Sequence, residues 1–201
     1  MMHRSKSPLY SFLKDISTVA SLISGGAIGV IPTDTIYGIV VSALVPASVE
    51  RLYAVRGRDR RKPCIILISA ITELAQFGII SDEKLQDALA RVWPGAVSVI
   101  LDCPDEKFTY LHRGTKTLSF RLPEDETLKT FLEKSGPLVA PSANPEGKPP
   151  ARDITEAESY FGDTVDFYVD GGERGGEPST LVRYKRGDFT EVRRGSIQIP
   201  E

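Results

Sequence analysis

Residues 27–38 read AIGVIPTDTIYG, and this stretch is the clearest guide to the fold class. Its first five residues form a short apolar run, which is typical of a buried strand. A polar segment, 32–38, follows, in which Thr33 and Thr35 flank Asp34. If the strand geometry continues, the two threonines lie on one face and Asp34 on the other. Two hydroxyls on one face can bind a polar ligand or a carboxylate; the alternative is a Thr/Asp turn that only closes the strand.

Around this stretch, apolar periodicity and chain-breaking residues predict both helices and strands. The predicted helices cover residues 11–24, 47–55, 81–92, 125–134 and 154–161. The predicted strands cover residues 27–31, 64–68, 97–101, 117–122, 137–140, 165–169, 180–184 and 190–193. Helices and strands in this order indicate an α/β fold, with one domain built on a mixed sheet.

Composition narrows the class of protein. The chain has 201 residues, of which 41% are hydrophobic and 26% charged, and its formal net charge is −2. This profile is typical of a globular protein and argues against a dedicated nucleic-acid binder, which is usually basic. No apolar run reaches the ~18 residues of a membrane span and no signal peptide is recognised, so a cytoplasmic location is expected. Cys64 and Cys103 lie in or beside apolar runs and are predicted to be buried thiols.

Several common catalytic motifs are absent from the sequence. It contains no GxxxxGK[ST] loop, no GxGxxG after a strand, no HExxH, no Cys/His cluster and no GxSxG elbow. The only histidines are His3, near the N-terminus, and His112, in a polar loop, and both are interpreted as surface residues. Any catalysis is therefore expected to proceed without a histidine base.

Further polar segments follow the predicted helices and strands. They comprise the basic run 56–62, the pair Ser142 and Asn144, the pair Ser179 and Thr180 after a glycine-rich stretch, and Arg193 in a basic turn. Arginine forks match phosphate oxygens, and α/β proteins place ligands where strands meet helices. Each segment alone is also compatible with a solvated loop. Together they predict a cavity lined by hydroxyls and arginines that suits a nucleoside triphosphate and a small polar acid.

Seven motifs occur in order along the chain: PTDTIYG at 32–38, RGRDRRKP at 56–63, WPGAVSVIL at 93–101, SFRLP at 119–123, PSAN at 141–144, STLV at 179–182 and VRRG at 192–195. This set resembles the YrdC-like family of threonylcarbamoyl-AMP synthases over residues 22–197. The resemblance implies a twisted, open, mixed sheet, similar to a double-stranded-RNA-binding fold, with a large, positively charged concave cavity. It also implies the short form of the family, a single domain over residues 1–201 without a further C-terminal domain.

The resemblance implies a reaction as well. L-threonine, bicarbonate and ATP would give L-threonylcarbamoyl-AMP and pyrophosphate by nucleotidyl transfer. Mg²⁺ would be carried by the nucleotide, with no metal held by protein side chains alone. The product would pass to a tRNA threonylcarbamoyltransferase that modifies the adenosine next to the anticodon, and a weak contact with tRNA belongs to this expectation.

The family's site residues fall on matching positions of this sequence. Arg56 and Arg58 match the pair that holds the phosphates and would be the catalytic residues. The positions implied for ATP are Arg56, Arg58, Lys62, Ser142, Asn144 and Arg193, and those implied for threonine are Thr33, Thr35, Arg121, Ser179 and Thr180.

Two departures from the family pattern leave alternatives open. Arg56 stands where the family has lysine, and a planar guanidinium is not equivalent to a compact ammonium at a phosphate site; Lys62 is the alternative source of an ammonium. The family's GPxT stretch reads GAVS at 95–98, which keeps a hydroxyl but loses the proline. The alternatives are a module that binds tRNA or double-stranded RNA, a paralogue with another activity, and a carbamoyl-transfer domain like those in hydrogenase-maturation proteins.

Overall fold

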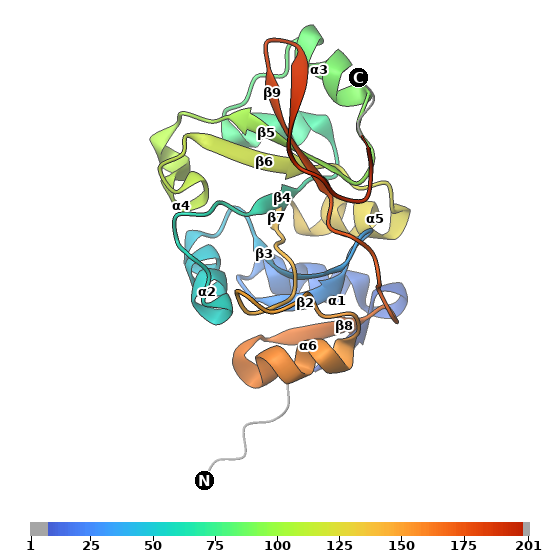
Figure 1. The fold of residues 1–201 in the computed structure, drawn as a ribbon. Helices are drawn as coiled ribbons and strands as arrows, with labels where there is room; N and C mark the ends of the chain where they lie inside the picture. Colours follow the sequence, from blue (N-terminus) through green and yellow to red (C-terminus); the bar gives the residue numbers. More distant parts are fainter. Residues whose placement is uncertain (1–7, 199–201) are drawn as a thin grey trace.

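Ten strands form one twisted, open sheet in the computed structural model, which describes residues 8–198 (Figure 1). Their order across the sheet is β1-β8-β2-β3-β7-β4-β6-β5-β9-β10. The strands are β1 (Leu9–Ser11), β2 (Gly29–Pro32), β3 (Tyr37–Ser42), β4 (Ile65–Leu67), β5 (Val97–Asp102), β6 (Thr117–Arg121), β7 (Leu138–Val139), β8 (Phe167–Asp170), β9 (Thr180–Lys185) and β10 (Asp188–Arg193). Parallel pairs such as β4 with β6 occur beside antiparallel pairs such as β2 with β3, so the sheet is mixed, as predicted.

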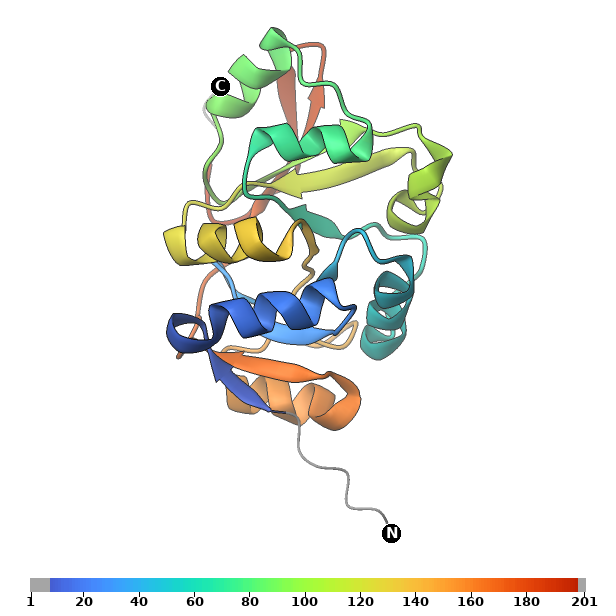
Figure 2. The same ribbon diagram turned by 180° about the vertical axis from the view of Figure 1, so that it is seen from behind.

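Helices cover both faces of the sheet. In Figure 2, α1 (Phe12–Ser24), α5 (Glu126–Ser135) and the 3-10 helix η1 (Ile71–Phe77) lie across one face, and α6 (Ile154–Phe161) lies on the other side, beside β8. Helix α2 (Pro46–Arg56) contacts β3. The remaining helical elements of the described chain are α3 (Glu83–Ala90), α4 (Thr109–His112), η2 (Glu106–Phe108) and η3 (Gly162–Thr164). None of the helices in residues 8–198 is long and apolar enough to cross a membrane.

Successive side chains of a strand point to opposite faces of the sheet, so the central strands contribute to a buried core on each face. Ile39 and Val41 of β3 belong to one buried cluster, which also contains Leu52 of α2. Val40, between them, belongs to the other cluster, together with Ile23 of α1. Every residue of β3 is buried, so its sequence YGIVVS lacks the polar alternation of a half-exposed strand.

The structure confirms the predicted helices and strands within a few residues. Among the described elements, no prediction corresponds to β1, β3, α4 or the 3-10 helices η1, η2 and η3. The buried state predicted for Cys64 and Cys103 is confirmed, and both are free thiols. The surface position predicted for His112 is wrong. His112 is fully buried at the end of α4, where its Nδ1 accepts a hydrogen bond from the Gly114 N–H (3.1 Å). His3 lies outside the described residues.

Strand β3 brings two of the polar segments side by side. It pairs with β2 across the turn 33–36, and its first residues also pair with the chain that follows β7. The Ile39 N–H donates to the Pro141 carbonyl (3.0 Å), and the Ala143 N–H donates to the Tyr37 carbonyl (2.8 Å). The sequence PSAN therefore lies beside the start of β3, next to the turn that carries the two threonines.

Candidate functional site

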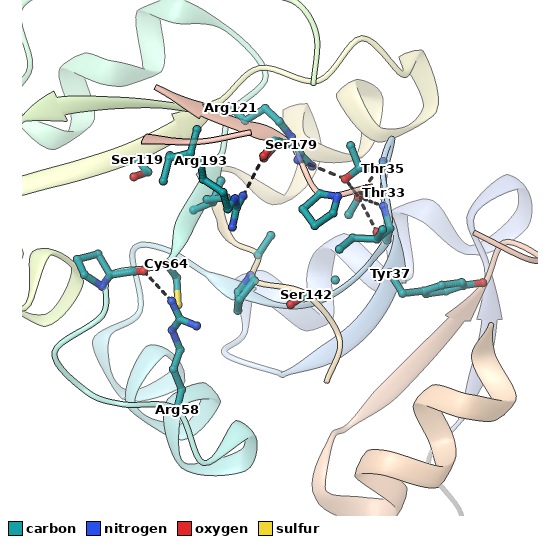
Figure 3. A pocket seen from close by; sticks show the side chains of 18 residues that line it. Thr33, Thr35, Tyr37, Arg58, Cys64, Ser119, Arg121, Ser142, Ser179 and Arg193 are labelled. Carbon is teal, nitrogen blue, oxygen red and sulfur yellow. Dashed lines mark hydrogen bonds between the residues drawn. The ribbon is translucent and has the colours of Figure 1, made fainter. Parts of the chain in front are cut away.

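A pocket with a volume of about 190 Å³ opens where these segments meet (Figure 3). Its wall comes from the turn after β2, the loop 57–63 (here the basic loop), strand β6, the segment after β7, the approach to β9 and the end of β10. The lining residues with polar side chains are Thr33, Thr35, Tyr37, Arg58, Cys64, Ser119, Arg121, Ser142, Ser179 and Arg193. The fold thus brings most of the predicted site residues to one cavity.

The two threonines meet through a turn. The Thr33 N–H and hydroxyl both donate to the Ile36 carbonyl (3.2 and 2.7 Å), and this closes the turn. The hydroxyl oxygens of Thr33 and Thr35 lie 3.2 Å apart. The premise that strand geometry continues past Pro32 is therefore wrong, because the chain reverses there. The two hydroxyls are nevertheless adjacent, so they can bind one ligand group together.

Arg121 forms a buried ion pair in the wall of the pocket. Its Nη2 donates to Asp34 Oδ1 (2.8 Å), and its Nη1 donates to Thr35 Oγ1 (3.3 Å). Burial raises the pKa of Asp34, and the positive charge of Arg121 opposes that rise. Burial likewise lowers the pKa of Arg121, and Asp34 opposes the fall. The pair thus holds a guanidinium beside the turn 33–36, here called the threonine turn.

Main-chain carbonyls orient Arg58. The basic loop begins at Gly57, which ends α2 in the left-handed conformation (φ 60°). A residue with a Cβ would be strained at this position. Arg58 Nε donates to the Lys62 carbonyl (3.2 Å), and Nη2 donates to the Pro63 carbonyl (3.0 Å). In Figure 3, the guanidinium groups of Arg58 and Arg193 point into the pocket from opposite sides.

Arg193 and Ser179 form the part of the wall next to β9. Arg193 Nη2 donates to the Ser179 carbonyl (2.9 Å), and the Ser179 hydroxyl lies 2.8 Å from the Ser98 hydroxyl. The Thr180 side chain points elsewhere, because its Oγ1 hydrogen-bonds the Ile197 carbonyl and the Gly195 N–H. Ser98, the hydroxyl that survives in the GAVS stretch, therefore contacts the pocket wall through Ser179.

Four predicted site residues are absent from the pocket lining: Arg56, Lys62, Asn144 and Thr180. Arg56 is buried behind the wall. Its Nε donates to the Asn144 carbonyl (2.8 Å), and its Nη2 donates to Asn144 Oδ1 (3.1 Å) and Ser142 Oγ (3.4 Å). Lys62 lies on the outer side of the basic loop, where Nζ pairs with Glu146 Oε1 (2.8 Å). Arg56 therefore contacts the pocket indirectly, through Ser142.

The arginines give the pocket an excess of positive charge. Burial, followed by repulsion from Arg58, lowers the pKa of Arg56 to about 10. The same two causes lower the pKa of Arg193. No Asp or Glu is among the described residues that line the pocket. The two carboxylates nearby already have partners, because Asp34 pairs with Arg121 and Glu146 pairs with Lys62 on the outer side of the basic loop. An anionic ligand between Arg58 and Arg193 would relieve the repulsion, so the site favours phosphate or carboxylate groups.

The segment 171–179 runs beside the threonine turn. The Tyr37 hydroxyl fixes its start, donating to the Gly172 carbonyl (2.8 Å) and accepting from the Gly171 N–H (3.0 Å). Further along, a Cβ at Gly176 would lie 2.6 Å from the Thr35 carbonyl oxygen, so only glycine permits this approach. Gly176 is therefore needed where this segment packs against the turn, and Gly171 where it packs against Pro32, whose Cγ would lie 2.5 Å from an added Cβ.

The sequence did not predict that Ser119, Tyr37 and Cys64 line the pocket, or that Asp34 pairs with Arg121. Strand parity could have identified Ser119, because it lies two residues before Arg121 on a predicted strand and therefore on the same face. No sequence signal pairs Asp34 with Arg121, since the contact depends on how the turn 33–36 lies against β6.

Comparisons with known proteins identify the family of this chain. The Sua5/YciO/YrdC family model, described as "Telomere recombination", matches residues 21–195, so the chain belongs to this family. It is 31% identical over 170 residues to the threonylcarbamoyl-AMP synthase of Bacillus subtilis, covering 83% of this chain and 49% of that protein. It is 30% identical over 189 residues to the threonylcarbamoyl-AMP synthase of Pyrococcus abyssi, covering 92% of this chain and 55% of that protein. The chain thus spans about half the length of these two relatives.

A solved structure, P. abyssi Sua5 complexed with L-threonine, is also similar. It superposes with a TM-score of 0.82 at 28% sequence identity, over 94% of this chain and 57% of that one. The predicted α/β fold with a twisted open sheet is therefore confirmed, and so is the predicted family.

Proposed function

We propose that this chain synthesises L-threonylcarbamoyl-AMP from L-threonine, bicarbonate and ATP, releasing pyrophosphate as a nucleotidyltransferase. The observation that carries the proposal is the pocket in which Arg58 and Arg193 face each other beside the hydroxyls of Thr33 and Thr35. The names of the two curated relatives and the threonine-bound Sua5 structure support it.

The threonine turn is the proposed amino acid end of the pocket. Arg121 supplies a fixed positive charge for the substrate carboxylate, and the paired hydroxyls of Thr33 and Thr35 supply hydrogen bonds. Ser179 completes the polar wall. Thr180 takes part only by holding the chain after β10 in place, because its side chain is bonded to that segment.

The other end of the pocket is the proposed ATP site. Arg58 and Arg193 contact the phosphates, and Ser142 adds a hydroxyl. Arg56 and Asn144 support Ser142 from behind, and Lys62 fixes the outer side of the loop through Glu146. Mg²⁺ enters with the triphosphate as part of the substrate.

The proposed reaction depends on positioning and charge neutralisation rather than on a covalent nucleophile. The neutral amine of threonine attacks carbon dioxide derived from bicarbonate and becomes a carbamate. The proton that the amine loses combines with the hydroxide released from bicarbonate, so the second product of this step is water. A carbamate oxygen then attacks the α-phosphorus of ATP, and the bond to the β-phosphate breaks as pyrophosphate leaves. Arg58 and Arg193 stabilise the charge that develops on the leaving phosphates.

The product is a mixed anhydride, so a second enzyme must use it before water does. We propose a tRNA threonylcarbamoyltransferase as that enzyme, with only weak contact between this chain and the tRNA. A cytoplasmic location, where ATP and tRNA are both present, belongs to the same proposal.

Pyrophosphate release from ATP is expected to require threonine and bicarbonate together. The reason is that the carbamate, not the free amino acid, is the proposed nucleophile. The measurement is a coupled pyrophosphate assay with each substrate omitted in turn, and with serine or glycine in place of threonine. Equal release without an amino acid, or with glycine, would contradict the proposal. Steeply salt-dependent RNA binding without ATP turnover would favour the RNA-binding alternative instead.

Replacing Arg56 by lysine is expected to weaken ATP binding ~10-fold, or about 1.4 kcal/mol. The guanidinium bonds Asn144 at two atoms and also Ser142, whereas a single ammonium cannot reproduce this planar set of contacts. The measurement is the KM for ATP. Arg51→Lys is the matched control, because Arg51 lies on the same helix and makes its bonds to Asp166 and Thr164 at the surface. An unchanged or lower KM for Arg56→Lys with kcat intact would reject this role of Arg56.

A further inference from the structure

The basic loop rests on a buried aromatic residue that does not itself line the pocket. Tyr53, on α2, is 2% exposed. Its hydroxyl donates to the Lys62 carbonyl (2.8 Å) and accepts from the Cys64 thiol (3.4 Å). Both the donor and an acceptor site of the hydroxyl are therefore occupied, and this fixes the direction of its O–H bond.

The Lys62 carbonyl is shared between Tyr53 and Arg58. One of its lone pairs accepts from the Tyr53 hydroxyl and the other from Arg58 Nε (3.2 Å). The next carbonyl, of Pro63, accepts from Arg58 Nη2 (3.0 Å). These two carbonyls hold one edge of the guanidinium, which leaves Nη1 available on the pocket side. The direction in which Arg58 points therefore depends on the orientation of the Lys62 carbonyl.

The ring of Tyr53 is itself held in place. The Arg113 guanidinium lies over the ring, 4.0 Å from its centroid, in a cation–π contact. Arg113 Nη1 pairs with Glu50 Oε1 (2.5 Å), and Glu50 lies one turn before Tyr53 on α2. The Arg113 side chain is only 10% exposed. The phenol is thus fixed from the face of its ring as well as from its hydroxyl.

We infer that Tyr53 is a positioning residue for nucleotide binding, which acts through the Lys62 carbonyl to aim Arg58 at the phosphates. This inference rests on the proposed function, because it assumes that the ligand of Arg58 is ATP. It adds to that function a residue outside the pocket whose hydroxyl sets the geometry of the phosphate contact.

The test is Tyr53→Phe, which keeps the ring and its contact with Arg113 and removes only the hydroxyl. Tyr110→Phe is the matched control, because the Tyr110 hydroxyl also donates to a main-chain carbonyl (Ala43, 2.9 Å) but lies away from the pocket. We expect kcat/KM for ATP to fall ~10-fold in Tyr53→Phe and to stay within about twofold in Tyr110→Phe. Melting temperatures of both variants separate this effect from a loss of stability. Equal kcat/KM values for the two variants would overturn the inference.

A double-mutant cycle identifies the route of the effect. In an Arg58→Ala background, Tyr53→Phe is expected to change ATP binding less than about twofold, because the group that it aims is gone. A ~10-fold effect that persists in this background would show that Tyr53 acts elsewhere and would overturn the inference. The readout is equilibrium titration with ATP, which needs no turnover. If the wild-type chain binds ATP but releases no pyrophosphate with threonine and bicarbonate, the proposed function fails, and the titration still decides the inference.

Discussion

Arg58→Ala is expected to lower kcat/KM for pyrophosphate release by ~30- to 1000-fold, about 2–4 kcal/mol of transition-state stabilisation. Arg58 is the one residue of the basic loop whose guanidinium lines the pocket, and carbonyls already hold it in position. A preorganised donor of this kind contributes most where charge develops, on the phosphates that leave. Steady-state kinetics with saturating threonine and bicarbonate measures the loss.

Arg60→Ala is the matched control for that variant. Arg60 belongs to the same loop, but its side chain is 68% exposed and lies 3.3 Å from Glu50, outside the pocket lining. Its loss is expected to change kcat/KM less than about threefold, as for an exposed ion pair. Similar losses for Arg58→Ala and Arg60→Ala would mean that the loop acts as a diffuse patch of charge, and the assigned role of Arg58 would be wrong.

Arg121→Met is expected to lower the free energy of unfolding by ~3 kcal/mol near pH 7.5, because it leaves the Asp34 carboxylate buried without its partner. Burial raises the pKa of Asp34 even when Arg121 is present, and the variant loses the charge that opposes this rise. A carboxyl whose pKa is raised in the folded state destabilises the fold when ionised. The deficit relative to wild type should therefore shrink as the pH falls below that raised pKa. Denaturant melts at several pH values measure it.

Two further variants separate stability from binding at this position. Arg51→Met removes an exposed ion pair with Asp166 and is expected to cost less than about 1 kcal/mol. Adding Asp34→Asn to Arg121→Met removes the unpaired charge, so it should restore most of the stability without restoring threonine binding. A double variant that stays as unstable as Arg121→Met, or one that binds threonine normally, would contradict the role given to this pair.

Elements of the fold were predictable where the apolar periodicity of the sequence matches the burial of the side chains in the structure. Helices α3 and α5 have an apolar stripe and an aspartate cap, and both were predicted within two residues. β3 was missed because its first two residues, Tyr37 and Gly38, were assigned to the polar segment 32–38, although the apolar run that follows resembles that of 27–31. His112 was assigned to the surface because its neighbours in the sequence are polar, but packing of the short helix α4 buries its side chain.

The site was predictable as a set of loops but not as a set of contacts. The order of strands in the sheet brings Thr33, Arg58 and Arg121 to one pocket, and the sequence contains each of them in a recognisable motif. The direction of each side chain depends on contacts between distant segments. Arg56 illustrates the difference: its motif position suggests a phosphate contact, whereas its guanidinium is bonded to Asn144 behind the wall.

Formation of the adenylate from labelled bicarbonate is the decisive test of the proposed reaction. The chain is incubated with ¹⁴C-bicarbonate, L-threonine, ATP and Mg²⁺, and the nucleotides are separated by chromatography at once, before the anhydride hydrolyses. We expect a new adenylate that contains the ¹⁴C label, forms in step with pyrophosphate and is absent when threonine is omitted. With Arg58→Ala in place of the wild type, its rate of formation should fall ~30- to 1000-fold. Pyrophosphate release in step with unlabelled AMP, with no label in any adenylate even at the earliest times, would contradict the proposed reaction.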